Sequence, residues 1–191
     1  LNPRYKEPYI VGSWIMSLEA GRPDMAIRLL QKGAKNMPEQ WIFDYESGFY
    51  AFKNLKDYKL AEKFFNKAAA NPEAPSHVQR KSAHMVYMRN DLQAAYRMWI
   101  DIYKNAKDRM TRDAAHHHLF QIKFEMDKKN LEQQILKYKE KYKRFPHSLE
   151  LLKKTGYIQS VPTDMDGHNY IYNSKTGKVN AQKEFRWKKS Y

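Results

Sequence analysis

The chain of 191 residues contains no cysteine. This absence excludes disulfide bonds, thiolate metal ligands and cysteine nucleophiles together. The sequence also lacks any apolar run near the roughly 18 residues that a membrane-spanning helix needs. It begins at Leu1 without a methionine and without a basic-then-apolar leader. We therefore expect a fragment or a mature form, from which an anchor or signal has been removed.

The motifs that assemble catalytic sites are missing as well. The sequence has no phosphate-binding glycine loop, no nucleophile elbow and no zinc-protease helix. Nothing in the pattern combines a nucleophile, a base and an orienting group. We therefore expect no enzymatic activity and no cofactor. Signatures of helix-turn-helix, zinc-finger and RNA-binding domains are also missing, and we expect no specific nucleic-acid partner.

Two short stretches carry residues that bind metals in other proteins. His116, His117 and His118 are consecutive, and neighbours on a helix point about 100° apart, so they cannot converge on one ion. We expect one of them to pack and two to face water. Asp164 and Asp166 precede Gly167, but the twelve-residue calcium-loop pattern ending in glutamate is missing. The sequence predicts no metal site and leaves open whether these two aspartates bind a cation.

What the chain has in excess is positive charge. It carries 35 Lys and Arg against 21 Asp and Glu, a net charge of +14. Such a balance favours anionic partners, namely nucleic acid, acidic lipid headgroups or an acidic protein surface. The alternative is a basic protein whose lysines lie on solvated helix faces. Only 138–144 and 183–191 are locally dense in positive charge.

Three segments of the first hundred residues align with one another: 21–33, 56–68 and 90–102. Each has a turn signal, then a small residue, then a large apolar residue four positions later and a further apolar or small residue three positions after that. The small residues recur at spacings of 35 and 34. The three sets are Ala26, Leu30 and Gly33; Ala61, Phe65 and Ala68; and Ala95, Trp99 and Ile102.

This period and these residue types resemble the tetratricopeptide repeat, over about residues 5 to 107. The resemblance implies a mainly α fold, an α-solenoid in which helix pairs form a right-handed superhelix, with about three repeats in 1–107. Pro38 and Pro72 follow second helices, and Pro3 suggests that residues 1–3 end a further, missing repeat. The glycine that the family places in each first helix is displaced or lost, with Trp14, Gly48 and Ala83 near that position. An unrelated helical bundle is the alternative.

In this family the first helices line a concave groove. Counting back from the three alanines to the first helix of each repeat predicts which residues face the groove. These residues are apolar in the first repeat and become aromatic and basic in the later ones. The family's carboxylate clamp is mostly missing, since Val11, Ile15 and Ser47 occupy its positions. We therefore expect a protein or peptide partner with an acidic segment, bound by Tyr50, Lys53, Arg80, Lys81, His84 and Tyr87. The other predicted groove residues are Leu18, Phe43, Glu46, His77 and Met88, together with Val11, Ile15 and Ser47.

Beyond residue 107, apolar residues at helical spacing predict two more helices, 109–129 and 130–144. A solenoid needs a terminal element to cover its last core. We expect these two helices, within 108–144, to be that cap.

The composition changes after residue 144. Ser148 predicts the start of a short helix that ends at Gly156. An extended run is expected at 157–161, and residues 170–172 and 178–181 predict a β-hairpin around a polar turn at 173–177. The segment 145–182 is thus an appendage that packs against the last helices, followed by a basic tail, 183–191.

The order of residues in this appendage resembles the C-terminal segment of type IV pilins and type II secretion pseudopilins. There a short helix leads into a proline–aspartate–glycine loop and a final hairpin. Met165 and Asp166 replace the family's proline and tryptophan, and the N-terminal pilin helix is not in this chain. The resemblance implies a bacterial origin and the cell envelope. Its matching residues are Phe145, Pro146, Ser148, Leu149, Gly156, Tyr157, Pro162, Asp164, Gly167, Tyr170 and Tyr172.

Together these features predict a non-enzymatic adaptor in a bacterial envelope assembly, related to a pilus or to secretion. The location would be periplasmic, or membrane-anchored through a missing N-terminus, with the cytoplasm as the alternative. A second hypothesis is a basic module that binds an anionic membrane or nucleic acid without specificity. It would use Lys139, Lys141, Lys143 and Arg144 with Arg186, Lys188 and Lys189. A third is that the repeats serve only self-association.

Overall fold

The computed structural model of the protein describes residues 3–182. The chain is mainly helical and ends in a small antiparallel sheet. By its internal contacts it divides into two compact units, Leu1–Arg112 and Asp113–Tyr191. The predicted tail residues Arg186, Lys188 and Lys189 lie outside the described part of the chain.

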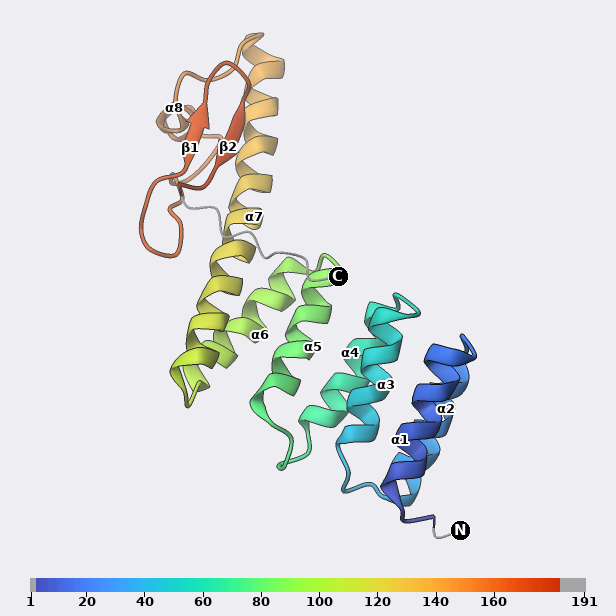
Figure 1. The fold of residues 1–191 in the computed structure, drawn as a ribbon. Helices are drawn as coiled ribbons and strands as arrows, with labels where there is room; N and C mark the ends of the chain where they lie inside the picture. The colour runs from blue at the N-terminus through green and yellow to red at the C-terminus, as the bar shows by residue number, and fades with distance from the viewer. Residues whose placement is uncertain (1–2, 183–191) are drawn as a thin grey trace. The chain divides into compact units, whose positions relative to one another are not determined.

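The first unit consists of short helices, each of which packs on the next along the chain (Figure 1). One segment, η1, is a π-helix that continues α1. The elements are α1 (Lys6–Trp14), η1 (Ile15–Glu19), α2 (Pro23–Asn36), α3 (Ile42–Lys53), α4 (Tyr58–Ala69), α5 (Ser76–Met88) and α6 (Leu92–Asn105).

Two aspartates define where α4 and α6 begin. The Asp57 side chain accepts a hydrogen bond from the Leu60 amide at 2.9 Å, and Asp91 accepts one from the Ala94 amide at 3.1 Å. Both aspartates are N-caps, which satisfy amides that have no partner within the helix. The turn signals before the second and third aligned segments are therefore capped helix starts.

The aligned positions form the interior of the first unit. All three alanines are fully buried, and so are the large residues that follow them. Gly48 lets α3 approach α4 closely, because a Cβ there would lie 2.9 Å from the ring of Phe65. On α1 the close approach is made by Gly12, whose Cβ would lie 2.8 Å from Leu29, whereas Trp14 is exposed. The glycine expected in the first helix of the first repeat is thus displaced rather than lost.

The two helices expected over 109–144 are one helix, α7 (Arg109–Tyr142). The separation at Asn130 was wrong because nothing there stops a helix, since neither proline nor glycine occurs between residues 109 and 142. Asparagine in a helix interior costs only a few tenths of a kcal/mol more than ordinary residues. The ion pair between Lys128 and Glu132, 3.8 Å apart, spans this point. Within residues 3–182, no helix is both long enough and apolar enough to cross a membrane.

The second unit contains most of α7, the short helix α8 (Leu149–Lys154) and the strands β1 (Ile171–Asn173) and β2 (Lys178–Asn180). The strands pair antiparallel, with Tyr172 opposite Val179, which confirms the predicted hairpin. Ser148 caps α8 by accepting from the Leu151 amide at 3.3 Å. The extended run at 157–161 forms no strand; an isolated bridge joins Thr163 to Asn169 instead.

One apolar core holds the second unit together. It joins α7, α8 and the hairpin, so the C-terminal segment does pack against the helix that precedes it (Figure 1). Its buried members are Phe120, Leu131, Ile135, Tyr138, Leu149, Leu152, Tyr170, Val179 and Ala181.

Candidate functional site

The partly exposed side chains of α3 and α5 form the surface that we name the α3–α5 face. Rings and charges from both helices come together on it. Its members on α3 are Ile42, Tyr45, Glu46, Phe49, Phe52 and Lys53, and those on α5 are His77, Arg80, Lys81, His84, Tyr87 and Met88. Five of the six residues predicted to bind a partner therefore lie on this face.

The sixth, Tyr50, does not. Its side chain is only 3% exposed, and its hydroxyl lies 3.5 Å from the Ser13 hydroxyl of α1. Phe43 and Ser47 are likewise fully buried. The prediction failed because the loop between α3 and α4 has one residue more than the loop between α5 and α6. One residue turns a helix by 100°, so counting back from Ala61 selected the buried side of α3.

The aromatic side chains of the α3–α5 face lie close to one another and to Trp41, the residue that precedes α3, and most of the pairs are edge to face. The rings of Trp41 and Tyr45 lie 5.7 Å apart, and that of His77 lies 5.6 Å from Tyr45 and 6.4 Å from Trp41. A second group joins Phe52 to His84 at 6.4 Å and His84 to Tyr87 at 6.1 Å. Such rigid, half-exposed rings suit the anchoring of apolar side chains from a partner.

Sequence reasoning missed Trp41, Tyr45 and Phe52. The signal that could have found them was the distance from the small residue of the first helix to the capping aspartate of the second. That distance is one residue longer from Gly48 to Asp57 than from Ala83 to Asp91.

Positive charges lie close enough on this face to perturb one another. Burial, and after it the charges of Lys53 and Arg80, lower the pKa of Lys81. Burial, then Arg80 and Lys81, lower the pKa of His77, and burial followed by Lys81 lowers that of His84. The lowered pKa values of these three side chains mean that this face disfavours further positive charge. An anionic group arriving here would relieve that repulsion.

Other polar residues lie beside these cations. Arg80 donates a hydrogen bond to the Thr111 hydroxyl at 2.9 Å, which ties the guanidinium to the start of α7. Asp108 caps that helix by accepting from the Thr111 amide at 2.7 Å. Glu46 lies on the same face, and burial raises the pKa of its carboxyl group.

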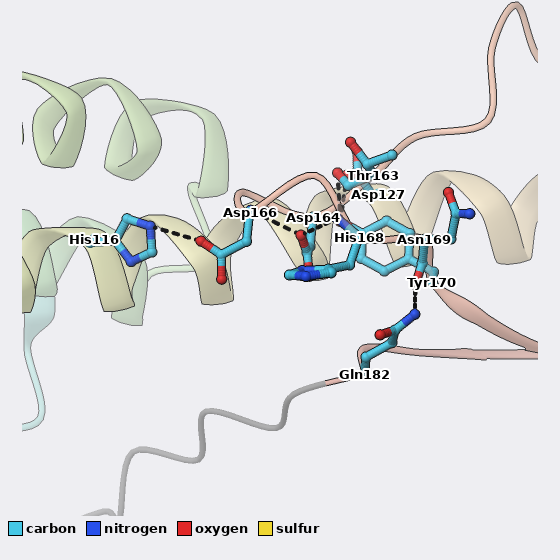
Figure 2. Close-up of polar contacts among 9 residues, drawn as sticks. All are labelled: His116, Asp127, Thr163, Asp164, Asp166, His168, Asn169, Tyr170 and Gln182. Atoms are coloured by element: carbon cyan, nitrogen blue, oxygen red, sulfur yellow. Dashed lines mark hydrogen bonds and ion pairs between the residues drawn. The ribbon is translucent and has the colours of Figure 1, made fainter.

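A different polar site lies in the loop between α8 and β1 (Figure 2). Asp164 is buried, and its Oδ1 accepts hydrogen bonds from the amides of Asp166 at 2.9 Å and His168 at 2.8 Å. The backbone amide of Asp164 donates to the His168 carbonyl at 2.9 Å, and Gly167 takes a positive φ of 85°. The carboxylate thus holds a tight turn closed.

Side chains of this loop also contact α7 (Figure 2). Asp166 Oδ1 lies 3.3 Å from His116 Nε2, and the Tyr170 hydroxyl donates to Asp127 at 2.7 Å. Asp164 and Asp166 therefore have different partners. Over residues 3–182, no group of three or more histidines and carboxylates is placed to hold a metal ion. His118 is buried whereas His116 and His117 are partly exposed, as expected for a packed histidine beside two that reach water.

The basic residues near the end of α7 form the remaining charged surface. Lys139, Lys141, Lys143 and Arg144 are exposed. The Lys139 ammonium lies 4.1 Å from the centre of the Phe145 ring, a cation–π contact. Lys141 makes a second such contact, 5.4 Å from the centre of the Tyr142 ring.

Comparison of the chain with protein-family models, with curated proteins and with solved structures found no match.

Proposed function

We propose that this protein is a non-enzymatic adaptor whose α3–α5 face binds an acidic segment of a partner protein. The observation that carries the proposal is the grouping of Lys53, Arg80 and Lys81 beside half-exposed aromatic rings. Arginine and lysine provide charge-assisted hydrogen bonds to carboxylates, and the rings provide apolar anchors. A partner segment would then contain both acidic and large apolar residues.

The scaffold for this face is a solenoid of the tetratricopeptide kind. Support comes from the burial of small residues at matching positions of α2, α4 and α6, and from the packing of each helix on the next. Stacked helix pairs of this kind form extended surfaces suited to peptide segments. The adaptor is passive, because binding needs no chemical step.

The setting that we propose is a bacterial envelope assembly related to a pilus or to secretion. Its support is the C-terminal unit, in which a short helix, an aspartate-stabilised loop and a hairpin pack on a long helix. This order of elements is the one that the resemblance to pilin ends implies. The setting is periplasmic or membrane-anchored.

A labelled peptide tests the binding face. A twelve-residue fluorescein-labelled peptide that alternates glutamate with leucine and tyrosine serves as the probe, and the same peptide with glutamine serves as the uncharged control. We expect the variant Arg80→Glu with Lys81→Glu to weaken binding of the acidic peptide at least tenfold, since two charge-assisted contacts become repulsive. Its helical circular dichroism should stay unchanged.

The matched control changes the same net charge elsewhere. Lys137→Glu with Lys141→Glu alters two exposed lysines of α7 and should leave peptide affinity nearly unchanged. Equal losses in both variants, or binding that disappears by 200 mM salt for every polyanion, would show that only overall charge attracts the peptide. Unaltered binding by the first variant would exclude the α3–α5 face.

The second candidate function, binding to an anionic membrane, is favoured by the exposed cations at 139–144. About 1 kcal/mol per basic residue is typical for attraction to acidic lipids. Vesicles that contain one third phosphatidylserine should pellet the protein, and deletion of residues 183–191 should reduce this pelleting. Equal pelleting by neutral vesicles would reject this function.

A further inference from the structure

Two histidines of the α3–α5 face lie on either side of the two cations that α5 contributes to it. His77 precedes Arg80 and Lys81 by three and four residues. His84 follows the same two residues by four and three. On a helix, residues three and four positions apart are neighbours, so each histidine lies next to both cations. All four side chains are partly exposed. An anion that binds at Arg80 and Lys81 therefore also comes close to both imidazole rings.

Aromatic side chains of α3 lie against both histidines. The His77 ring is 5.6 Å from the Tyr45 ring, and the His84 ring is 6.4 Å from the Phe52 ring. Such rings displace water from an imidazole but bring no negative charge to it. Burial is accordingly the largest cause of the lowered pKa of both histidines, and the positive charges on α5 come next. In the free protein both rings are therefore neutral at pH 7.

Other titratable or charged groups lie around the two histidines and their cations. They are Tyr45, Glu46 and Lys53 of α3, Tyr58 of α4, Tyr87 of α5 and Asp108, which precedes α7. The tyrosines stay neutral below about pH 9, and Asp108 caps α7. The acidic Glu62 of α4 is paired with Arg89, and the buried residues of α6 do not titrate. Among the members of the α3–α5 face, Glu46 is the one acidic residue.

A carboxylate bound at Lys81 favours the charged form of both imidazoles. An opposite charge within about 4 to 6 Å raises the pKa of a histidine, and the imidazolium then donates a charge-assisted hydrogen bond to it. By thermodynamic linkage, a ligand that promotes protonation binds more tightly when the protons are already bound. Glu46 acts in the same direction. Burial raises the pKa of its carboxyl group, so its negative charge, which repels an acidic ligand, is lost at a higher pH than in an ordinary glutamate.

We propose that His77 and His84 take up protons when the acidic segment binds, so that the α3–α5 face binds its partner more tightly at pH 5.5 than at pH 7.5. Regulation by pH rests on the proposed function, because it concerns binding at that same face. The protonated rings add two cationic contacts beside the side chains of Lys53, Arg80 and Lys81. Glutamates of the partner segment keep their charge at pH 5.5, because their ordinary pKa is about 4.3. The partner is therefore captured in mildly acidic surroundings and released more readily at neutral pH.

Isothermal titration calorimetry with the glutamate peptide and its glutamine counterpart tests this inference. Both peptides are used without the fluorescein label, whose own titration would interfere, at pH 5.5, 6.5 and 7.5 and constant ionic strength. We expect the dissociation constant of the glutamate peptide to fall about tenfold from pH 7.5 to pH 5.5, and that of the glutamine peptide to change less than about twofold. Titrations at pH 6.5 in two buffers of different ionisation enthalpy count the protons, and we expect an uptake of between about 0.5 and 2 per peptide.

A double variant removes the two titrating rings. His77→Gln combined with His84→Gln keeps polar side chains of similar size, and its affinity should change less than about threefold between pH 7.5 and pH 5.5. Its proton uptake should fall below half of the wild-type value. His147→Gln is the matched control, because His147 is exposed in the second unit, and it should keep the wild-type pH dependence. Circular dichroism at each pH verifies that every variant is folded.

The outcomes separate regulation by pH from binding itself. Equal affinity for the glutamate peptide at pH 5.5 and pH 7.5 would overturn this inference and leave the proposed function in place. A pH dependence that the double variant retains in full would also overturn it, since other groups would then take up the protons. Absence of binding at every pH would overturn the proposed function and the inference together.

Discussion

Replacing Gly48 by alanine sets two opposing effects against each other. Alanine is favoured over glycine in a helix interior by about 1 kcal/mol. The new methyl group, however, would lie 2.9 Å from two ring carbons of Phe65, closer than carbon atoms approach in proteins. The Phe65 ring cannot move easily, because it is 1% exposed and packs 5.6 Å from the Tyr45 ring. Overpacking of this kind costs about 1 to 3 kcal/mol.

The steric cost should win, and Gly48→Ala should lower the free energy of unfolding by about 1 kcal/mol, within a range of 0 to 2. Thermal unfolding followed by circular dichroism measures this, at roughly 3 °C per kcal/mol for a chain of this size. Gly12→Ala is the matched control. Its methyl group would meet only the end of the half-buried Leu29 side chain, which can rotate, so this variant should be neutral or slightly stabilised.

A double variant identifies the clash. In a Phe65→Leu background, Gly48→Ala should no longer destabilise, because the smaller side chain leaves room for the methyl group. If Gly48→Ala stabilises the wild type by the full propensity of about 1 kcal/mol, α3 and α4 do not approach at Gly48 as described.

Three further predictions concern single side chains. Asp57→Ala should cost about 1 kcal/mol of unfolding free energy, measured in urea, whereas Asp57→Asn should retain most of the stability because asparagine also caps helices. Asp164→Ala should speed hydrogen exchange at the amides of Asp166 and His168, because these amides lose their acceptor. Asp164→Asn should partly restore their protection. Equal exchange in the wild type and both variants would contradict a structural role for the carboxylate. Burial, and after it the charge of Lys81, lower the pKa of His84 in the folded state below its ordinary value. The unfolded state therefore binds more protons at this side chain. As a result, the free energy of unfolding falls as the pH drops below about 6.5. His84→Gln should lessen that fall in unfolding experiments at pH 5 and 7, and an unchanged slope would contradict a half-buried, neutral His84.

The local signals of the sequence predicted the elements well. The capping aspartates, the alanine period and the hairpin turn all depend on residues near one another in the chain. Ser148 and Gly156 likewise mark the short helix that the structure contains. Local hydrogen bonds and backbone preferences act within a few residues, so a sequence displays them directly.

The candidate site was predicted less well, because the side of a helix that faces outward depends on an exact count of residues. One additional loop residue between α3 and α4 placed Tyr50 in the interior and Tyr45 and Phe52 on the surface. The residues predicted on α5, which is followed by the shorter loop, do lie on the partly exposed side of that helix. An error of one position rotates every side chain of a helix by 100°. Because α3 has large apolar residues on both its buried and its exposed side, its sequence did not reveal the error.

The sequence by itself determined that the chain is mainly helical, where most helices begin, and that its small residues recur with a period near 34. Only the tertiary structure decided which side of each helix is covered. It brought Lys53, Arg80 and Lys81 beside aromatic rings, placed the Asp164 carboxylate against two backbone amides, and left the large apolar residues of α1 and η1 exposed. The physical reason is that burial results from the packing of all neighbouring helices together, whereas propensity and capping act within one helix.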